Sequence, residues 1–249
     1  MMRRFAIMLS YDGTNYCGWQ RQAGDLSIQA LLEEALQPLN SGQPVKVIGA
    51  GRTDSGVHAR AQVAHFDLES AHSAETIRRA LNATLPGDIY VRICQSVDQN
   101  FHARFGALRR EYKYQILLEP SVFEQRYAWL CPYQLDFDLL QQAAEIVQGE
   151  HDFTNLCRRS TEAESKLCTV YESYWERADY KLIYTIQANR FLHSMVRMIV
   201  GAMTEVARGK YPLSAFKNLL GKNDRPMQVY TAPAKGLILW SIEYKEQLS

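Results

Sequence analysis

Residues 45–66 read VKVIGAGRTDSGVHARAQVAHF, and the loop at their centre is the stretch around which the chain is organised. An apolar, strand-like run over 45–48 precedes this loop, and a second strand-like run over 62–66 follows it. Between the two runs, residues 49–58 gather three glycines, an Arg, an Asp and a His. This composition predicts a tightly turned loop that carries polar groups between two strands.

Two familiar kinds of glycine-rich loop can be tested against this spacing. A dinucleotide-binding loop that begins at the first two glycines needs a third glycine or alanine where Asp54 stands, and a carboxylate there would repel a pyrophosphate. A loop for nucleoside triphosphates needs Lys and then Ser or Thr after its last glycine, whereas Val and His follow Gly56. Both kinds are excluded, and the residues alone favour a simple tight turn over 54–56.

Five stretches, taken in order, resemble one known family. The first match is Gly-Arg-Thr-Asp-Ser-Gly-Val-His-Ala at 51–59, continued by the strand-like run at 62–66. The other matching segments are Tyr11-Asp12-Gly13-Thr14 with Gly18-Trp19-Gln20, Phe101-His102-Ala103-Arg104 with Tyr112-Lys113-Tyr114, Phe191-Leu192 with Met195-Val196-Arg197 and Ile199-Val200-Gly201, and Ala232-Pro233-Ala234 with Gly236-Leu237. Together they resemble the TruA family of tRNA pseudouridine synthases over nearly the whole chain.

Two positions depart from the family pattern. Cys168 stands where the family usually carries an Arg in a strand, and Val229-Tyr230 replaces a pair that is usually small. Neither departure touches the loop that carries Asp54, but both bear on substrate contacts in the second half of the chain.

The composition is that of an ordinary globular protein: 249 residues, 47% hydrophobic and 22% charged. The net charge is only +1, so an RNA-binding surface must come from local clustering of basic residues. Five scattered cysteines without a C-x-x-C pair predict free thiols, a reducing compartment and no zinc site. Because the first apolar run is short and no run approaches 18 residues, we expect a soluble, cytoplasmic protein without a membrane span.

Strands and helices alternate in a similar order in both halves of the chain. Ser27, Ser73 and Asp136 are expected to cap helices, and the most apolar helix is predicted from Phe191 to Arg208, ending at Gly209. Short connections between strands favour mixed or antiparallel sheets. The resemblance likewise implies an α+β fold with two similar domains, 1–105 and 106–249, whose sheets have helices on one side and meet at a central cleft.

The resemblance also implies the chemistry. The family converts uridine to pseudouridine in the anticodon stem-loop of tRNA, at positions 38 to 40, and needs no cofactor or metal. By the match, Asp54 is the catalytic carboxylate, either nucleophile or base, and acts on a flipped-out uridine. Arg197 is its ion-pair partner, although its helix face would otherwise be interpreted as solvated. Tyr112 would stack on the target base, with its hydroxyl as a possible base.

Four further residues lie in or beside the matched segments. Arg52, His58, Arg104 and Lys235 are candidates for holding the substrate, although a solvated charge is the plain alternative for each. The remaining histidines lack metal-ligand spacing. The resemblance implies tRNA as partner and a homodimer. Two alternatives stay open: a module that binds structured RNA without modifying it, and an enzyme acting on free uridine or its phosphate.

Overall fold

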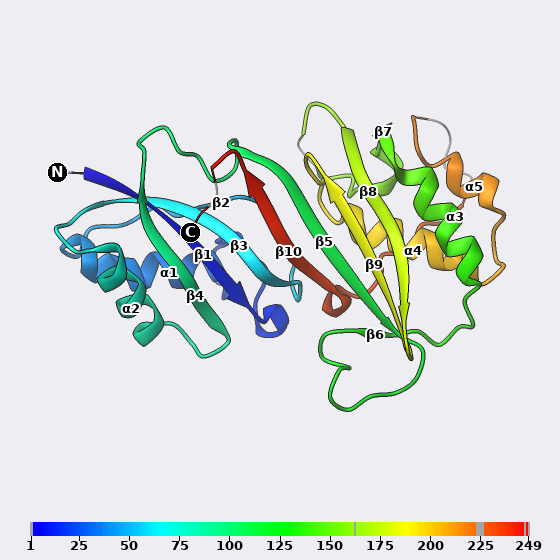
Figure 1. Cartoon of the computed structure of the whole chain (residues 1–249), viewed down its shortest axis with the longest axis horizontal. Helices are drawn as coiled ribbons and strands as arrows, with labels where there is room; N and C mark the ends of the chain where they lie inside the picture. The colour runs from blue at the N-terminus through cyan, green and yellow to red at the C-terminus, as the bar shows by residue number, and fades with distance from the viewer. Residues whose placement is uncertain (1, 162, 223–226, 247, 249) are drawn as a thin grey trace. The chain divides into compact units, whose positions relative to one another are not determined.

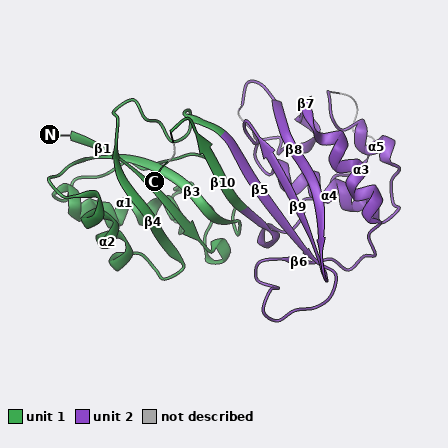
Figure 2. Ribbon diagram, in the orientation of Figure 1, with its two compact units in different colours: residues 1–108, 239–249 green, residues 109–238 purple. Residues whose placement is uncertain are grey.

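The computed structural model describes residues 2–161, 163–222, 227–246 and 248, and it contains two compact units (Figure 1, Figure 2). Unit 1 comprises residues 1–108 and 239–249, and unit 2 comprises residues 109–238. Each unit combines a sheet with helices, which confirms the expected α+β class. Independent domains at 1–105 and 106–249 stay a prediction, because compactness alone does not demonstrate separate folding.

Unit 1 is built on a sheet with the strand order β4-β1-β3-β10, and β2 pairs with β3. Its elements are β1 Met2–Tyr11, α1 Ile28–Leu36, β2 Ile48–Gly49, β3 His58–Glu69, α2 Ala74–Thr84, β4 Ile89–Val97 and all but the first two residues of β10 Leu237–Tyr244. β1 runs antiparallel to both β3 and β4, with Phe5 opposite Phe66 and Ile7 opposite Ala64. These side chains are buried, so the sheet centre supplies much of the core.

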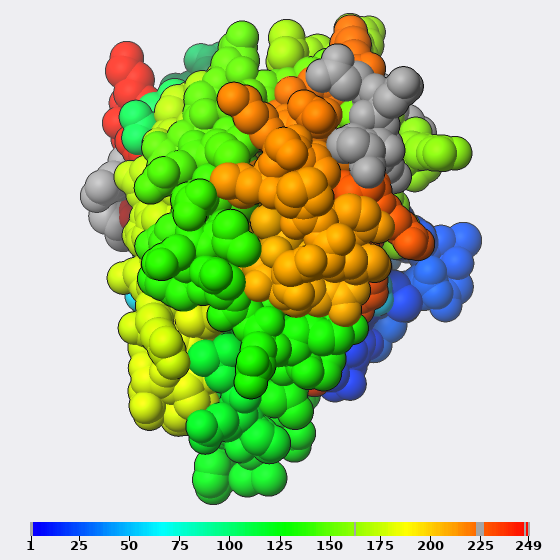
Figure 3. All heavy atoms as spheres, turned by 90° about the vertical axis from the view of Figure 1, so that its right-hand side faces the viewer, coloured from blue at the N-terminus to red at the C-terminus, as the bar shows by residue number. Residues whose placement is uncertain are grey.

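Unit 2 has the strand order β5-β9-β8-β7, and the short β6 runs parallel to β5. Its elements are most of β5 Ala107–Leu117, then β6 Trp129–Leu130, α3 Phe137–Val147, β7 Gly149–Asp152, β8 Leu167–Ala178, β9 Lys181–Ala188, α4 Met195–Ala207 and α5 Leu213–Lys217. The pairs β5–β9, β9–β8 and β8–β7 are antiparallel. α3 packs on β8, on α4 and on α5, and Figure 3 shows α3 in green beside the orange α5 region on the surface.

The three predicted helix caps are confirmed. The side-chain oxygens of Ser27, Ser73 and Asp136 accept the backbone N–H groups of Ala30, Thr76 and Leu139 at 3.3, 3.1 and 3.0 Å. Each bond satisfies one of the amides that the first helical turn leaves without a partner. Gly209, with φ of +78°, ends α4 in the left-handed conformation that glycine adopts most easily.

Several predicted boundaries were wrong. The strand expected over 45–49 is reduced to the two residues of β2, while β3 starts earlier than 62. Helix α4 begins at Met195 rather than at Phe191, because Ser194 adopts a left-handed φ of +59° that a continuous helix does not allow. The short strands β6 and β7 carry no alternating pattern of their own and were not predicted.

Candidate active site

Asp54 begins the tight turn that the sequence predicted. The Val57 N–H donates to the Asp54 carbonyl at 3.1 Å, and Gly56 has a φ of +76°. A type II turn needs a positive φ at its third residue, a conformation that is costly for residues with a Cβ atom. Asp54 itself is half-buried, so the turn places an acidic residue on a fixed backbone.

The segment at residues 11–20 holds this loop by close backbone approach. The Trp19 N–H donates to the Thr53 carbonyl at 3.1 Å. Gly18 has a φ of +88°, and a Cβ atom there would overlap the same carbonyl oxygen. A Cβ on Gly49 would lie 2.5 Å from Cε2 of Trp19, which is almost fully buried. Both glycines are therefore required for the chain to approach this closely.

Hydrogen bonds fix the residues on both sides of Asp54. The Tyr11 hydroxyl and the Thr53 hydroxyl lie 2.9 Å apart, and burial raises the pKa of Tyr11 to about 12, so this phenol stays neutral. After Asp54, the Ser55 hydroxyl and the Gly56 N–H both donate to the Tyr16 carbonyl, at 3.2 and 3.3 Å. The loop is thus anchored to residues 11–20 immediately before and after the carboxylate.

His58 is buried at the end of the loop, with only 3% of its surface exposed. Its Nδ1 accepts the Gly13 N–H at 3.0 Å and lies 3.1 Å from an Asp12 carboxylate oxygen. Asp12 in turn accepts the Thr14 N–H and hydroxyl, at 3.0 and 2.6 Å. This placement lets the imidazole hold the start of β3 against the 11–20 segment, while it leaves little ring surface for a phosphate.

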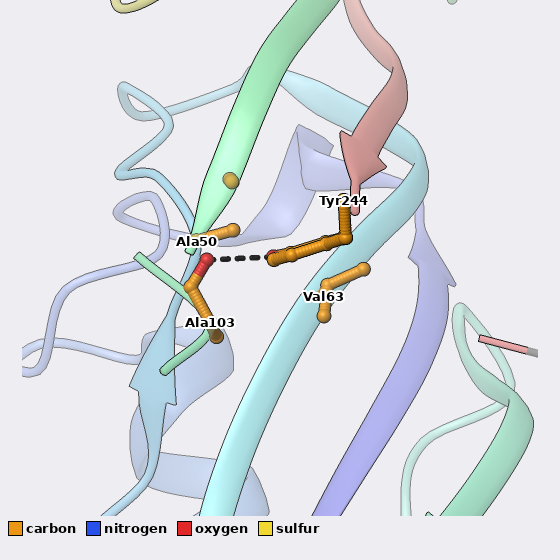
Figure 4. Packing of buried hydrophobic residues seen from close by; sticks show 5 residues of the cluster. Ala50, Val63, Ala103 and Tyr244 are labelled. Carbon is orange, nitrogen blue, oxygen red and sulfur yellow. Dashed lines mark hydrogen bonds between the residues drawn. The ribbon is translucent and has the colours of Figure 1, made fainter. Parts of the chain in front are cut away.

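Arg52 and Arg104 are both exposed in unit 1. The segment that carries Arg104 is held on two sides: the Ala103 N–H donates to His65 Nδ1 at 3.1 Å, and the Tyr244 hydroxyl donates to the Ala103 carbonyl at 2.6 Å. Figure 4 shows this second bond beside Ala50 and Val63, in the cluster where the Asp54 loop leaves β2. Burial, with the nearby charges of His102 and Arg4, lowers the pKa of His65 to about 4, so the ring accepts as a neutral group.

Tyr112 lies on β5 of unit 2, where it is 7% exposed and meets Phe191 edge to face with 5.1 Å between ring centres. Tyr114, two residues on, shares its face of the strand, because successive side chains point to opposite faces of a sheet. Its ring is fully buried, and its hydroxyl donates to the Pro233 carbonyl at 2.8 Å. Tyr114 is therefore a core residue.

Arg197 lies in the first turn of α4 and is bonded to the segment at 230–232. Its Nε donates to the Ala232 carbonyl at 2.8 Å, and the Ala232 N–H donates to the Arg197 carbonyl at 3.1 Å. The polar pattern of this helix face, taken alone, would be interpreted as solvated, but Thr204 is 1% exposed, and a Cβ on Gly201 would overlap the Tyr230 carbonyl oxygen. The chain at 230–232 covers the face, and a glycine at 201 lets it approach.

The family model described as tRNA pseudouridine synthase matches residues 7–106 and 143–245, which include every segment just described except Tyr112 and Tyr114 on β5. This chain belongs to the tRNA pseudouridine synthase family. Proteins named tRNA pseudouridine synthase A are similar to it over nearly their full lengths. The protein of a Geobacillus species is 38% identical over 98% of this chain and 99% of its own length. That of Geobacillus kaustophilus is 39% identical over 99% and 96%, respectively, and that of Brevibacillus brevis is 42% identical over 98% and 100%. As a pseudouridine synthase the protein is an isomerase, and its family converts uridine to pseudouridine in tRNA.

The structure divides the predicted residues of this pseudouridine synthase between its units. Unit 1 carries Arg52, Asp54, His58 and Arg104, and unit 2 carries Tyr112, Arg197 and the exposed Lys235. Within the described part of the chain, no group of three or more His, Cys, Asp or Glu side chains is placed to hold a metal ion. Over the same residues, no helix has the length and apolar character that crossing a membrane requires.

The 11–20 segment is the part of the synthase whose role the sequence interpretation missed. Its residues were matched to the family but were given no function, although they form the support of the Asp54 loop. Two glycines within six positions of a buried aromatic residue were the available signal, because such glycines often mark close approach of another chain segment.

Cys168 is 1% exposed on β8, and burial raises the pKa of its thiol although Arg190 lies within hydrogen-bonding reach. The residue that departs from the family pattern is therefore a buried neutral group next to a different arginine. Tyr230, the other departure, has a ring that is 49% exposed.

Proposed function

We propose that this protein isomerises uridines at positions 38 to 40 in the anticodon stem-loop of tRNA, with Asp54 as the essential carboxylate. The observation that carries the proposal is the support of Asp54. The carboxylate is half-buried on a turn whose neighbouring residues on both sides bond to the 11–20 segment. A rigidly held group of this kind can meet a reacting atom without having to be ordered during the reaction.

The formation of pseudouridine requires one rigidly held carboxylate. The bond between ribose C1′ and uracil N1 breaks, the base turns, a bond forms between C1′ and C5, C5 loses its proton and N1 gains one. The product has the same atoms and the same oxidation level as the substrate, so the reaction is an isomerisation. Asp54 acts as nucleophile or as base in this sequence, on a nucleotide that has been flipped out of its stack.

Arg197 is the proposed partner of that carboxylate. An opposite charge within a few ångströms favours the ionised form of an Asp against the effect of burial. The guanidinium is oriented by its Nε bond to Ala232, and it lies in the first turn of α4, where the helix dipole also attracts an anion. Both features support a role in holding a negatively charged group.

The remaining predicted residues take the following proposed roles. Tyr112 is proposed to contact the target base with its ring, which packs edge to face against Phe191. The exposed Arg52, Arg104 and Lys235 are proposed to bind RNA phosphates. For His58, the proposed role is to hold the Asp54 loop, because it is almost fully buried.

The working form is proposed to be a cytoplasmic homodimer that contacts one tRNA with both subunits, without a cofactor. The resemblance to the family supports this assembly, and the names of the similar proteins support tRNA as the substrate.

The test is to incubate the full-length protein with unmodified tRNA and to assay pseudouridine at each position of the anticodon stem-loop. Wild type should form product at positions 38 to 40, and Asp54→Ala should form none while still binding the tRNA. Binding without product from either protein would favour the module that only binds RNA. Turnover of free uridine or its phosphate would favour the small-nucleotide enzyme.

A further inference from the structure

A cavity of about 460 Å³ opens in unit 2, away from Arg197 and at the other end of α4. Its walls come from β6, from the residues at the end of α4 and from the segment 228–231. The side chains that matter here are Trp129, Tyr133, Glu205, Arg208, Lys210 and Tyr230. A volume of this size is typical of sites for small organic groups.

The cavity combines aromatic faces with positive charge. Tyr133 and Tyr230 are 41% and 49% exposed, and Tyr230 lies 6.2 Å, ring centre to ring centre, from the buried Trp129. The Arg208 guanidinium lies 4.2 Å from the centre of the Tyr133 ring. Exposed aromatic rings beside cations are what proteins use to stack nucleobases and hold the attached phosphates.

The positive charge outweighs the single acid. Glu205 accepts from Arg208 at 3.0 Å and from Lys210 at 2.7 Å. Burial alone raises the pKa of the Glu205 carboxyl, but the bonds from Lys210 and Arg208 outweigh it and leave that pKa lowered. One carboxylate therefore orders two cations and leaves one net positive charge at the cavity.

The distance between the cavity and Arg197 limits the size of a ligand that could contact both. Arg208 lies 11 residues after Arg197, which is about 16 Å along the helix. A single nucleotide is too short to reach both residues. The segment that lines the cavity also continues into Ala232, which bonds Arg197.

From these observations we propose that the cavity binds a second nucleotide of the RNA substrate, a base stacked on Tyr133 or Tyr230 with its phosphate at Lys210. This inference rests on the proposed action on tRNA. It also gives a role to Tyr230, which stands where the family pattern usually has a small residue. The site would therefore set the affinity for RNA without touching the uridine that reacts.

Direct binding of fluorescent tRNA, measured by anisotropy with full-length protein, tests the proposal. Of Tyr133→Ala and Tyr230→Ala, the variant that removes the stacking ring should raise the Kd about tenfold, which is the size expected for loss of one stacked base. Lys210→Glu should raise the Kd further. It should also lower the slope of log Kd against log salt concentration by about one or more, the amount expected for loss of one phosphate contact. Thermal midpoints close to wild type would verify that each variant is folded.

The matched controls are Tyr174→Ala and Lys217→Ala, because both side chains are exposed in unit 2 and neither lines the cavity. Both controls should bind tRNA within about twofold of wild type. Unchanged Kd values for Tyr133→Ala, Tyr230→Ala and Lys210→Glu would overturn the proposal.

Calorimetry with uridine 5′-monophosphate separates RNA from a free nucleotide as the source of the ligand. If the cavity variants lose affinity for the mononucleotide but keep wild-type affinity for tRNA, the site serves a free nucleotide and the proposal is wrong. Because the readout is binding, it stays separate from catalysis. A wild type that binds tRNA without forming pseudouridine would sink the proposed function alone.

Discussion

The Asp54 loop of unit 1 and the Arg197 turn of unit 2 are held in contrasting ways. The loop is tied on both sides of its acid by main-chain bonds to the 11–20 segment, and glycines at 18 and 49 leave no room for a larger residue. The segment at 230–232 bonds both the side chain and the backbone of Arg197: its Nε donates to the Ala232 carbonyl, and the Ala232 N–H donates to the Arg197 carbonyl. The bonds described in unit 1 fix the backbone on both sides of Asp54, whereas the Nε bond in unit 2 fixes the Arg197 side chain directly.

Different kinds of substitution should therefore impair the two regions. Damage near Asp54 should come from added volume in the supporting segment. Damage near Arg197 should come from changes to the guanidinium itself.

The largest effect is expected at Asp54. Asn has the same shape and can keep the turn, so Asp54→Asn should leave stability within about 0.5 kcal/mol of wild type. It should nevertheless lower the single-turnover rate of pseudouridine formation by about 10³-fold or more, because the charge and the proton acceptor are lost. Residual turnover above a tenth of wild type would contradict the role of the carboxylate.

The second largest effect is expected for Arg197→Lys, which tests how far orientation of the guanidinium matters in unit 2. Lys keeps the charge but has no Nε donor for Ala232 and no planar fork for a carboxylate. We expect the rate to fall about 10²-fold at unchanged tRNA affinity, measured by single-turnover kinetics and anisotropy. Arg197→Gln tests the charge, and it should be no faster than the Lys variant. A fully active Lys variant would show that orientation by Ala232 is unimportant.

Gly18→Ala tests the backbone support with a matched control. It should destabilise the protein by at least about 2 kcal/mol, because the new Cβ strains a positive φ and overlaps the Thr53 carbonyl. Gly24→Ala has a similar φ of +82° but open space around it, so it should cost only about 1 kcal/mol. Urea denaturation measures both values. Equal losses would mean that the approach to Thr53 contributes nothing.

The smallest effect is expected in acid. The pKa of His65 falls from an ordinary value of 6.5 to about 4 in the folded chain, so the unfolded chain takes up the proton more readily between these values. Stability from this group is complete above pH 6.5 and is lost as the pH falls toward 4. Between pH 7.5 and 5 we expect a loss of about 1 to 2 kcal/mol by urea denaturation. His65→Asn should flatten this dependence, and an unaltered slope would exclude His65 as its cause.

Local signals account for what the sequence could predict. Ser27, Ser73 and Asp136 cap helices through bonds to amides three residues away, so their neighbours in sequence were enough. The turn at Asp54 is local in the same sense, since Gly56 supplies its positive φ.

Contacts between distant segments account for what the sequence could not predict. His58 is a residue of a type that often contacts substrates, but Gly13 and Asp12, more than forty residues earlier, pack against it and help to bury it. The polar face of α4 has a solvated pattern, but residues 230–232 cover it. In both cases the residues that bury the polar group lie far away in the sequence, so the local pattern does not show the burial.

The placement of Tyr244 in unit 1 has a consequence for biosynthesis. Its hydroxyl bonds Ala103, and its ring packs in the cluster from which the Asp54 loop departs, more than a hundred residues earlier in the chain. Growing chains usually complete their N-terminal units first. Here the N-terminal unit keeps an open sheet edge on β3 until residue 244 has left the ribosome, although the whole of unit 2 has by then been synthesised. The loop that carries Asp54 therefore belongs to the first unit to be made and the last to be finished.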